Sequence, residues 1–276
     1  MSPRTSAAPW AALLLALALS GCAPLQEGLG RLADDAAALN PIRYYDQVDP
    51  DAPFAGSPAE DYGEGFEVPE AEPVGSFGEE QVAHAYAATR DLLEAVYLNE
   101  DAVFDEDNSE FNALLSGQVL EWYLDNLGHE DPERDTRHLP FNLSPGTAEP
   151  IGDVVKVDGS MRAEEVRDEW GAHYLAVHTE YTIVHPIARP GDRVSVRLVT
   201  SHRGEVAFHD VGEGALKAWP RWWRFVAPVH CLDEHTFTPA FPDEFSGEEH
   251  PGEAPLDPYN IEENGGAREC GAVQGT

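Results

Sequence analysis

The spacing of apolar residues changes partway along the chain, and this change constrains the fold more than any other feature. Before residue 128 apolar residues recur at helical spacing, and from Ile151 onward they alternate with polar residues, as in half-buried strands. Helices followed by a run of strands favour an α+β fold. We expect N-terminal helices packed on one face of a curved antiparallel sheet.

Two helices are expected ahead of the strands. The first covers residues 79–99, in which apolar side chains recur every three or four positions. The second begins at Asn108 or Ser109, residue types that cap helix N-termini, and stops at Gly128. Each helix would present one apolar face to the sheet.

The acidic residues 101–110 between these helices resemble the opening of a calcium-binding EF-hand. That loop needs glycine at its sixth position and glutamate at its twelfth, where this chain has Glu110 and Ser116. We therefore expect a solvated turn there and no metal site.

Strands are expected wherever the alternation is regular. The tetrapeptide Arg189-Pro190-Gly191-Asp192 has the composition of a tight turn, which predicts an antiparallel hairpin around it. The expected strands lie near residues 155–161, 174–183, 193–198 and 219–231, with a further one at 235–241.

This order of elements is similar to that of the cone-shaped NTF2-like fold, over residues 79–241. The resemblance implies a pocket lined by residues of the sheet. His178 and Glu180 share one strand face and could line that pocket as an acid–base pair, as in several NTF2-like families of proton-transfer enzymes. A solvated polar face is the other interpretation of these two residues.

The first 22 residues have the form of a bacterial export signal. The ten apolar residues from Trp10 to Leu19 are too few to span a bilayer as a helix. The sequence Leu19-Ser20-Gly21-Cys22 resembles the lipobox of bacterial lipoproteins. The resemblance implies that residues 1–21 are removed and that acyl chains on Cys22 hold the protein on the extracytoplasmic side of the cell membrane. An ordinary secreted leader, cleaved near Ala23, is the alternative.

Two acidic segments flank the expected folded domain, which covers residues 79–241. Residues 41–78 hold six prolines, five glycines and nine acids against a single arginine, and residues 242–276 hold nine acids against one arginine. Such compositions bury too little apolar surface to become ordered. We expect residues 22–78 to be a linker and residues 242–276 to be a tail.

Cys231 and Cys270 are the two cysteines that remain after lipidation of Cys22. Outside the membrane, oxidation is allowed, so a disulfide between them would fix the tail. The alternative is a metal site formed by the nearby set His230, Cys231, Asp233 and His235. We expect the disulfide, because the metal site would need further ligands.

The chain carries 51 acidic and 17 basic side chains, a formal net charge of −34. This charge excludes a nucleic-acid partner, because phosphate binding needs a basic surface. Adaptation to high salt is one explanation for the excess of acids.

Basic residues gather at 189–224, where seven stand against four acids. Arg197, Arg221 and Arg224 would form a recess for a small anionic ligand, because guanidinium groups bind carboxylate and phosphate with paired hydrogen bonds. Alternatively, the arginines pair with acids of neighbouring strands or of the tail.

Residues 219–225 interleave aromatic and basic side chains. In a strand, Trp222 and Arg224 would share one face, and Trp219, Trp223 and Phe225 the other. We expect the second set to lie in the core. Trp222 could then be an exposed platform for sugar rings of the cell wall.

The sequence contains no nucleophile elbow, zinc-protease motif, phosphate-binding loop or dinucleotide-binding glycine motif. We therefore expect a non-catalytic binding or accessory role at the cell envelope, without a cofactor. The alternatives are an NTF2-like lyase or isomerase that uses His178 and Glu180, or a structural protein associated with the cell wall.

Overall fold

The computed structural model describes residues 47–212, 215–230, 232, 235–244, 257–264 and 275–276. The expected leader and lipidated Cys22 lie outside these residues, as do both expected disulfide partners, Cys231 and Cys270. None of the helices in the described part of the chain combines the length and the apolar character needed to cross a bilayer.

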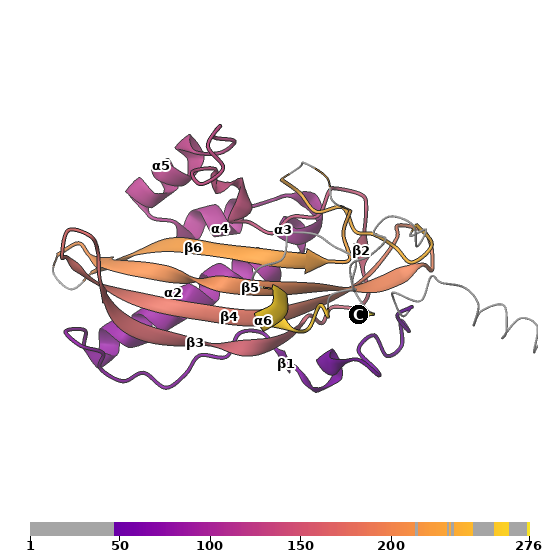
Figure 1. The fold of residues 1–276 in the computed structure, drawn as a ribbon, viewed down its shortest axis with the longest axis horizontal. Helices are drawn as coiled ribbons and strands as arrows, with labels where there is room; N and C mark the ends of the chain where they lie inside the picture. The colour runs from indigo at the N-terminus through magenta and orange to yellow at the C-terminus, as the bar shows by residue number, and fades with distance from the viewer. Residues whose placement is uncertain (1–46, 213–214, 231, 233–234, 245–256, 265–274) are drawn as a thin grey trace, which may run out of the picture. The chain divides into compact units, whose positions relative to one another are not determined.

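Four long strands form the body of an antiparallel sheet (Figure 1). They are β3 (Lys156–Arg167), β4 (His173–Ala188), β5 (Ser195–Asp210) and β6 (Leu216–Ala227), hydrogen-bonded in that order. The short strand β1 (Gly63–Glu64) pairs with β3, and β2 (Glu149–Pro150) pairs with β4. The predicted hairpin is confirmed, since the Arg189 N–H donates to the Val194 carbonyl across the turn between β4 and β5.

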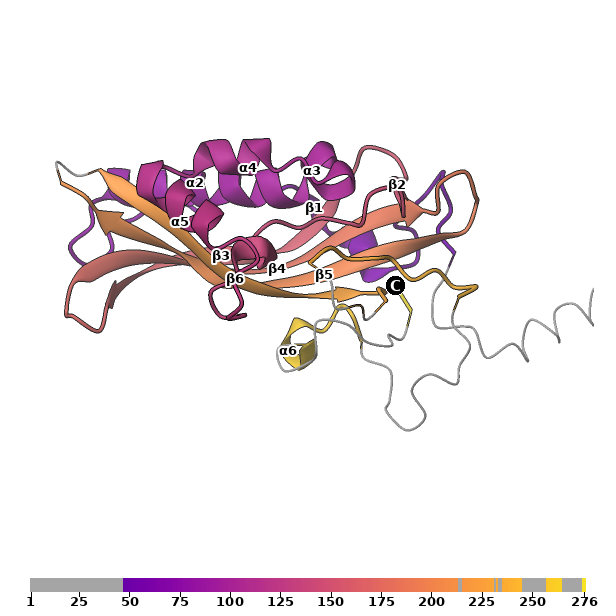
Figure 2. The ribbon, with the colours of Figure 1, turned by 90° about the horizontal axis from the view of Figure 1, so that it is seen from above.

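One face of the sheet, called the inner face below, carries most of the helices (Figure 2). These are α2 (Glu79–Tyr97), α3 (Glu100–Asp105), α4 (Ser109–Leu114) and α5 (Gly117–Asp125). The short helix α6 (Ile261–Asn264) lies on the opposite, outer face, beside β5. The α+β class is confirmed, with the difference that α6 follows the sheet instead of preceding it.

The core fills the space between α2 and the inner face. Val82, Leu93 and Val96 of α2 are fully buried, as are Val177 and Ile183 of β4. Each such side chain contributes about 1.5–3 kcal/mol through removal of apolar surface from water. The first predicted helix is thus confirmed. Its apolar residues recur every three or four positions because one face of the helix packs on the sheet.

The second predicted helix is broken into α4 and α5. The break falls at Leu115, whose backbone is extended and whose side chain is buried, and at Gly117, whose φ of +38° is left-handed. Glycine tolerates that conformation because it has no Cβ. The acidic segment expected to be only a turn also contains the short helix α3.

The expectation of a linker is wrong for residues 47–78, which pack along the sheet. Phe54 and Ala59 are buried against Val184 and Val199 of the outer face. Phe66 enters the main core, where its ring meets that of Tyr181 edge-on at 4.9 Å. A few well-placed aromatic side chains order this segment, and an averaged composition does not reveal them.

Arg197 fixes this segment to the outer face. Its guanidinium is buried and donates to the carbonyl oxygens of Pro53 (2.7 Å) and Ala55 (2.9 Å) and to the main-chain oxygen of Thr276 (2.6 Å). The arginine therefore joins two parts of the chain that lie far apart in sequence, and its donors are used within the protein.

Replacing Arg197 with methionine should lower the free energy of unfolding by about 2 kcal/mol, because buried carbonyl oxygens lose charged donors. Amide hydrogen exchange should become faster at residues 48–59 than in the wild type, and it should change less in the sheet. Arg193→Met, at an exposed arginine of the same hairpin, is the control and should change stability by less than about 0.5 kcal/mol. Equal effects of the two substitutions would contradict this role.

Candidate functional site

A groove of about 550 Å³ lies on the outer face of the sheet and gathers the polar side chains of three strands. Ile261 of α6, the short helix on the outer face, also lines it. Both His178 and Glu180 line this groove, on the face of the sheet opposite helices α2 to α5. Its other polar side chains include those of Asp158, Ser160, Arg162, Thr182 and Arg203.

His178 and Glu180 have different partners within the groove. The Glu180 carboxylate accepts a hydrogen bond from the Arg203 guanidinium at 3.0 Å. The His178 ring lies between two other carboxylates, 3.5 Å from Glu164 and 3.9 Å from Glu205. The two residues share a strand face as predicted, but each is paired with other residues and not with the other.

Arg221 belongs to a row of charged residues that crosses the four long strands. Arg162, His178, Glu205 and Arg221 lie directly opposite one another in register. The Arg221 side chain is 65% exposed, and its guanidinium is 4.0 Å from Glu205, the carboxylate that also faces His178. The interpretation that arginines pair with acids of neighbouring strands holds here and at Arg203.

Arg224 lies on the inner face and is buried. Its guanidinium donates to the carbonyl oxygens of Leu139 (2.7 Å) and Pro140 (2.5 Å) and lies 5.2 Å from the centre of the Tyr97 ring. With Arg197 buried on the other face, the three predicted anion-binding arginines do not converge on one recess. Of the three, Arg197 and Arg224 are buried and Arg221 is largely exposed.

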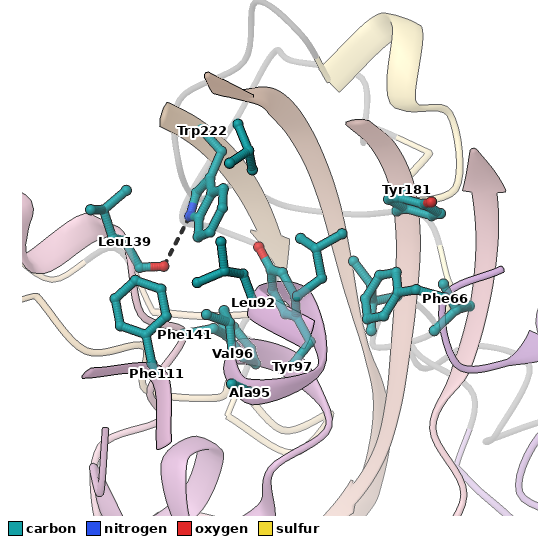
Figure 3. Close-up of a cluster of buried hydrophobic side chains, with 14 of the residues drawn as sticks. Phe66, Leu92, Ala95, Val96, Tyr97, Phe111, Leu139, Phe141, Tyr181 and Trp222 are labelled. Carbon is teal, nitrogen blue, oxygen red and sulfur yellow. Dashed lines mark hydrogen bonds between the residues drawn. The ribbon is translucent and has the colours of Figure 1, made fainter. Parts of the chain in front are cut away.

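Trp222 is also a core residue, and the expectation of an exposed platform is wrong. It is 4% exposed, and its indole N–H donates to the Leu139 carbonyl at 2.9 Å (Figure 3). The cross-strand neighbour is Gly204, where a Cβ would stand 2.3 Å from the Trp222 Cβ. The missing side chain makes room for the indole on the inner face, so its neighbour Trp223 is turned outward.

A buried polar cluster occupies the centre of the inner face. The His202 ring is hydrogen-bonded at both nitrogens, to the Tyr97 hydroxyl (2.9 Å) and to the Thr179 hydroxyl (2.9 Å). His185 donates from Nε2 to the Tyr97 carbonyl at 2.8 Å. Burial, reinforced by the nearby Arg224 charge, holds the pKa of His202 well below its usual value, so the ring is neutral.

These side chains leave little of the inner face for a ligand. Tyr97, Phe141 and Trp222 pack around His202 with ring-centre distances of about 5.5 Å or less between neighbours, and all are buried (Figure 3). Sequence reasoning missed this cluster. The available signal was that His185 and His202 each occupy an apolar position in the alternation of their strands.

The described residues contain no group of three or more histidine, cysteine, aspartate or glutamate side chains placed to hold a metal ion. The fold and the site define an α+β protein with a filled inner face and an open polar groove on its outer face. The chain matches no protein-family model, no curated protein and no solved structure.

Proposed function

We propose that this protein is a bacterial lipoprotein, anchored to the extracytoplasmic side of the cell membrane through Cys22, with a non-catalytic binding or accessory role at the cell envelope. The apolar run from Trp10 to Leu19 and the lipobox-like sequence that ends at Cys22 support the anchor. Two acyl chains bury enough methylene groups for durable attachment.

The observation that carries the non-catalytic role is that His178 and Glu180 have different partners. Glu180 is paired with Arg203, and the His178 ring lies between Glu164 and Glu205. A general base must reach the proton that it removes, with its carboxylate or imidazole oriented for that purpose. Side chains already paired with residues of neighbouring strands are better suited to stabilising the sheet than to transferring a proton.

The finer fold assignment is also part of the proposal. Helix α2 crosses one face of a curled antiparallel meander, which supports a relation to the NTF2-like cone (Figure 2). In that case the inner face would be a cone filled by Tyr97, Phe141 and Trp222. We also propose the Cys231–Cys270 disulfide, which peptide mapping without reductant would test.

The anchor is tested by labelling cells with radioactive palmitate. The wild-type chain should be labelled and sediment with membranes, whereas Cys22→Ser should lose both properties. Cys270→Ser is the matched control and should keep them. Recovery of an unlabelled chain from cytosol, still beginning at Met1, would refute the anchor.

The absence of catalysis is tested by complementation of a strain that lacks the gene. A chain carrying both His178→Ala and Glu180→Gln should restore the wild-type phenotype, provided that its melting temperature shows a folded protein, and Cys22→Ser should not restore it. An NTF2-like enzyme predicts the opposite for the double variant. Failure of that folded variant would favour the enzyme.

A further inference from the structure

A second hollow, called the edge cleft here, lies beside β6, the last strand of the sheet. It measures about 640 Å³, within the range of sites for small molecules. One wall is the segment from Gly128 to Pro140, and the other is formed by Trp223 and Arg224 of β6 together with His235 and Phe237. None of the residues predicted from the sequence to form a sugar platform or an acid–base pair lines it.

Trp223 gives the edge cleft an accessible aromatic surface. The residue is 38% exposed, and the Arg203 guanidinium lies 5.9 Å from the centre of its ring. An indole offers an apolar face on which the C–H groups of a sugar ring can stack, and an N–H for a hydroxyl group. Arg203 also lines the outer groove, so the two hollows are neighbours.

The opposite wall of the cleft is held in place by Asp135. This carboxylate accepts from the Gly128 N–H (2.9 Å) and from the Arg137 N–H (3.0 Å), and it pairs with the Arg137 guanidinium at 2.6 Å. The Arg137 hydrogen bonds lower the pKa of Asp135 to about 2. The wall is therefore organised before any ligand arrives, which reduces the entropy lost on binding.

The charges that line the cleft balance. Glu130 and Asp135 stand against Arg137 and Arg224, in a chain whose formal charge is −34 with histidine neutral. A balanced lining gives no net attraction for an anion or a cation. Three histidines, His129, His138 and His235, add planar polar groups suited to hydroxyl groups.

An adjoining hollow of about 570 Å³ shares Gly128, Arg137, Pro140 and His235 with the edge cleft. Its lining includes the amide side chains of Asn108, Asn112 and Asn142, of which Asn108 and Asn142 are hydrogen-bonded to each other, and the acidic residues Glu106 and Asp107. Amides can donate and accept at once, as adjacent sugar hydroxyls require. The shared lining would let a ligand longer than one ring extend from one hollow into the other.

We propose that the edge cleft binds a neutral saccharide, with one ring stacked on Trp223 and its hydroxyl groups facing the 128–140 wall. This inference gives the proposed binding role a ligand class. Saccharide binding can be disproved without disproving the lipid anchor, because binding by the cleft does not require lipid on Cys22.

The test is calorimetric titration of the whole chain, in a detergent without a sugar headgroup, with tri-N-acetylchitotriose and with maltotriose. At least one should bind saturably at one site, and binding should change little between 50 mM and 500 mM NaCl. Trp223→Ala should raise the Kd by about tenfold or more through loss of stacking, whereas Trp223→Phe should retain most of the affinity.

Trp170→Ala is the matched control. Trp170 is 83% exposed in the turn between β3 and β4, outside the cleft, and its removal should leave the Kd unchanged. Glu130→Gln, which preserves shape, should weaken binding severalfold. The proposal is overturned by absence of saturable binding to both sugars, by equal effects of the two tryptophan substitutions, or by displacement of the sugar by inorganic phosphate at lower concentration.

Discussion

Acidification from pH 7 to pH 4.5 is expected to lower the free energy of unfolding by about 2.5 kcal/mol through His185 alone. Burial lowers the pKa of His185 to about 4, against 6.5 for the ordinary side chain, and the hydrogen bond to the Tyr97 carbonyl only partly offsets this shift. In the unfolded chain the His185 side chain therefore binds a proton near pH 6.5, whereas in the folded chain it binds one only near pH 4. The stabilisation is complete above pH 6.5 and is lost as the pH falls toward 4. His202, whose pKa is also lowered, acts in the same direction.

The measurement is urea unfolding followed by tryptophan fluorescence at several pH values. Protonation of carboxylates relieves the repulsion of an acidic chain and opposes this trend, so the wild type is compared with His185→Gln. Glutamine can place an amide nitrogen near the position of Nε2 and cannot take up a proton in this range. The loss of stability between pH 7 and 4.5 should be smaller in the variant by about 2 kcal/mol. Equal losses would show that His185 is not the group responsible.

The parts of the fold that could be predicted are the helix and the strands in which burial of one side makes apolar residues recur at a regular spacing. Helix α2, the first half of β3 and most of β4 and β6 follow from such patterns, and the turn at Arg189 follows from its residue types. Of β5 (Ser195–Asp210), only the beginning was expected, and the strand expected at 235–241 is not among the strands of the described residues. The pattern does not extend to residues 47–78, where Phe54 and Phe66 enter sites created by strands far away in sequence. Composition reports an average over the segment, whereas ordering depends on a few long-range contacts.

The two tryptophans of β6 show why the site was harder to predict than the fold. Alternation correctly separates Trp222 from Trp223, but it does not say which face of the sheet meets the helices. That choice depends on the cross-strand pairing of Trp222 with Gly204, a contact set by the register of β5 and β6. The edge cleft likewise unites residues from the 128–140 segment, β6 and the 235–237 segment, which share no local motif.

Replacement of Tyr97 by alanine is expected to lower the free energy of unfolding by about 4 kcal/mol, because it removes a fully buried aromatic ring and leaves a cavity. The ring packs 5.5 Å from that of Phe141 and beneath the Arg224 guanidinium, and its hydroxyl meets His202. Tyr174→Ala, at a tyrosine on the rim of the sheet that is only half-buried, is the control and should cost about 1 kcal/mol.

The conservative variant Tyr97→Phe separates the hydroxyl from the ring. It keeps the packing but deprives His202 Nδ1 of its partner, which should cost about 1–2 kcal/mol. In a double-mutant cycle with His202→Gln, the two single costs should exceed the cost of the double variant, since either change alone already breaks the shared hydrogen bond. Additive costs would mean that Tyr97 and His202 are independent, and that the inner face is held by ring packing and not by its polar cluster.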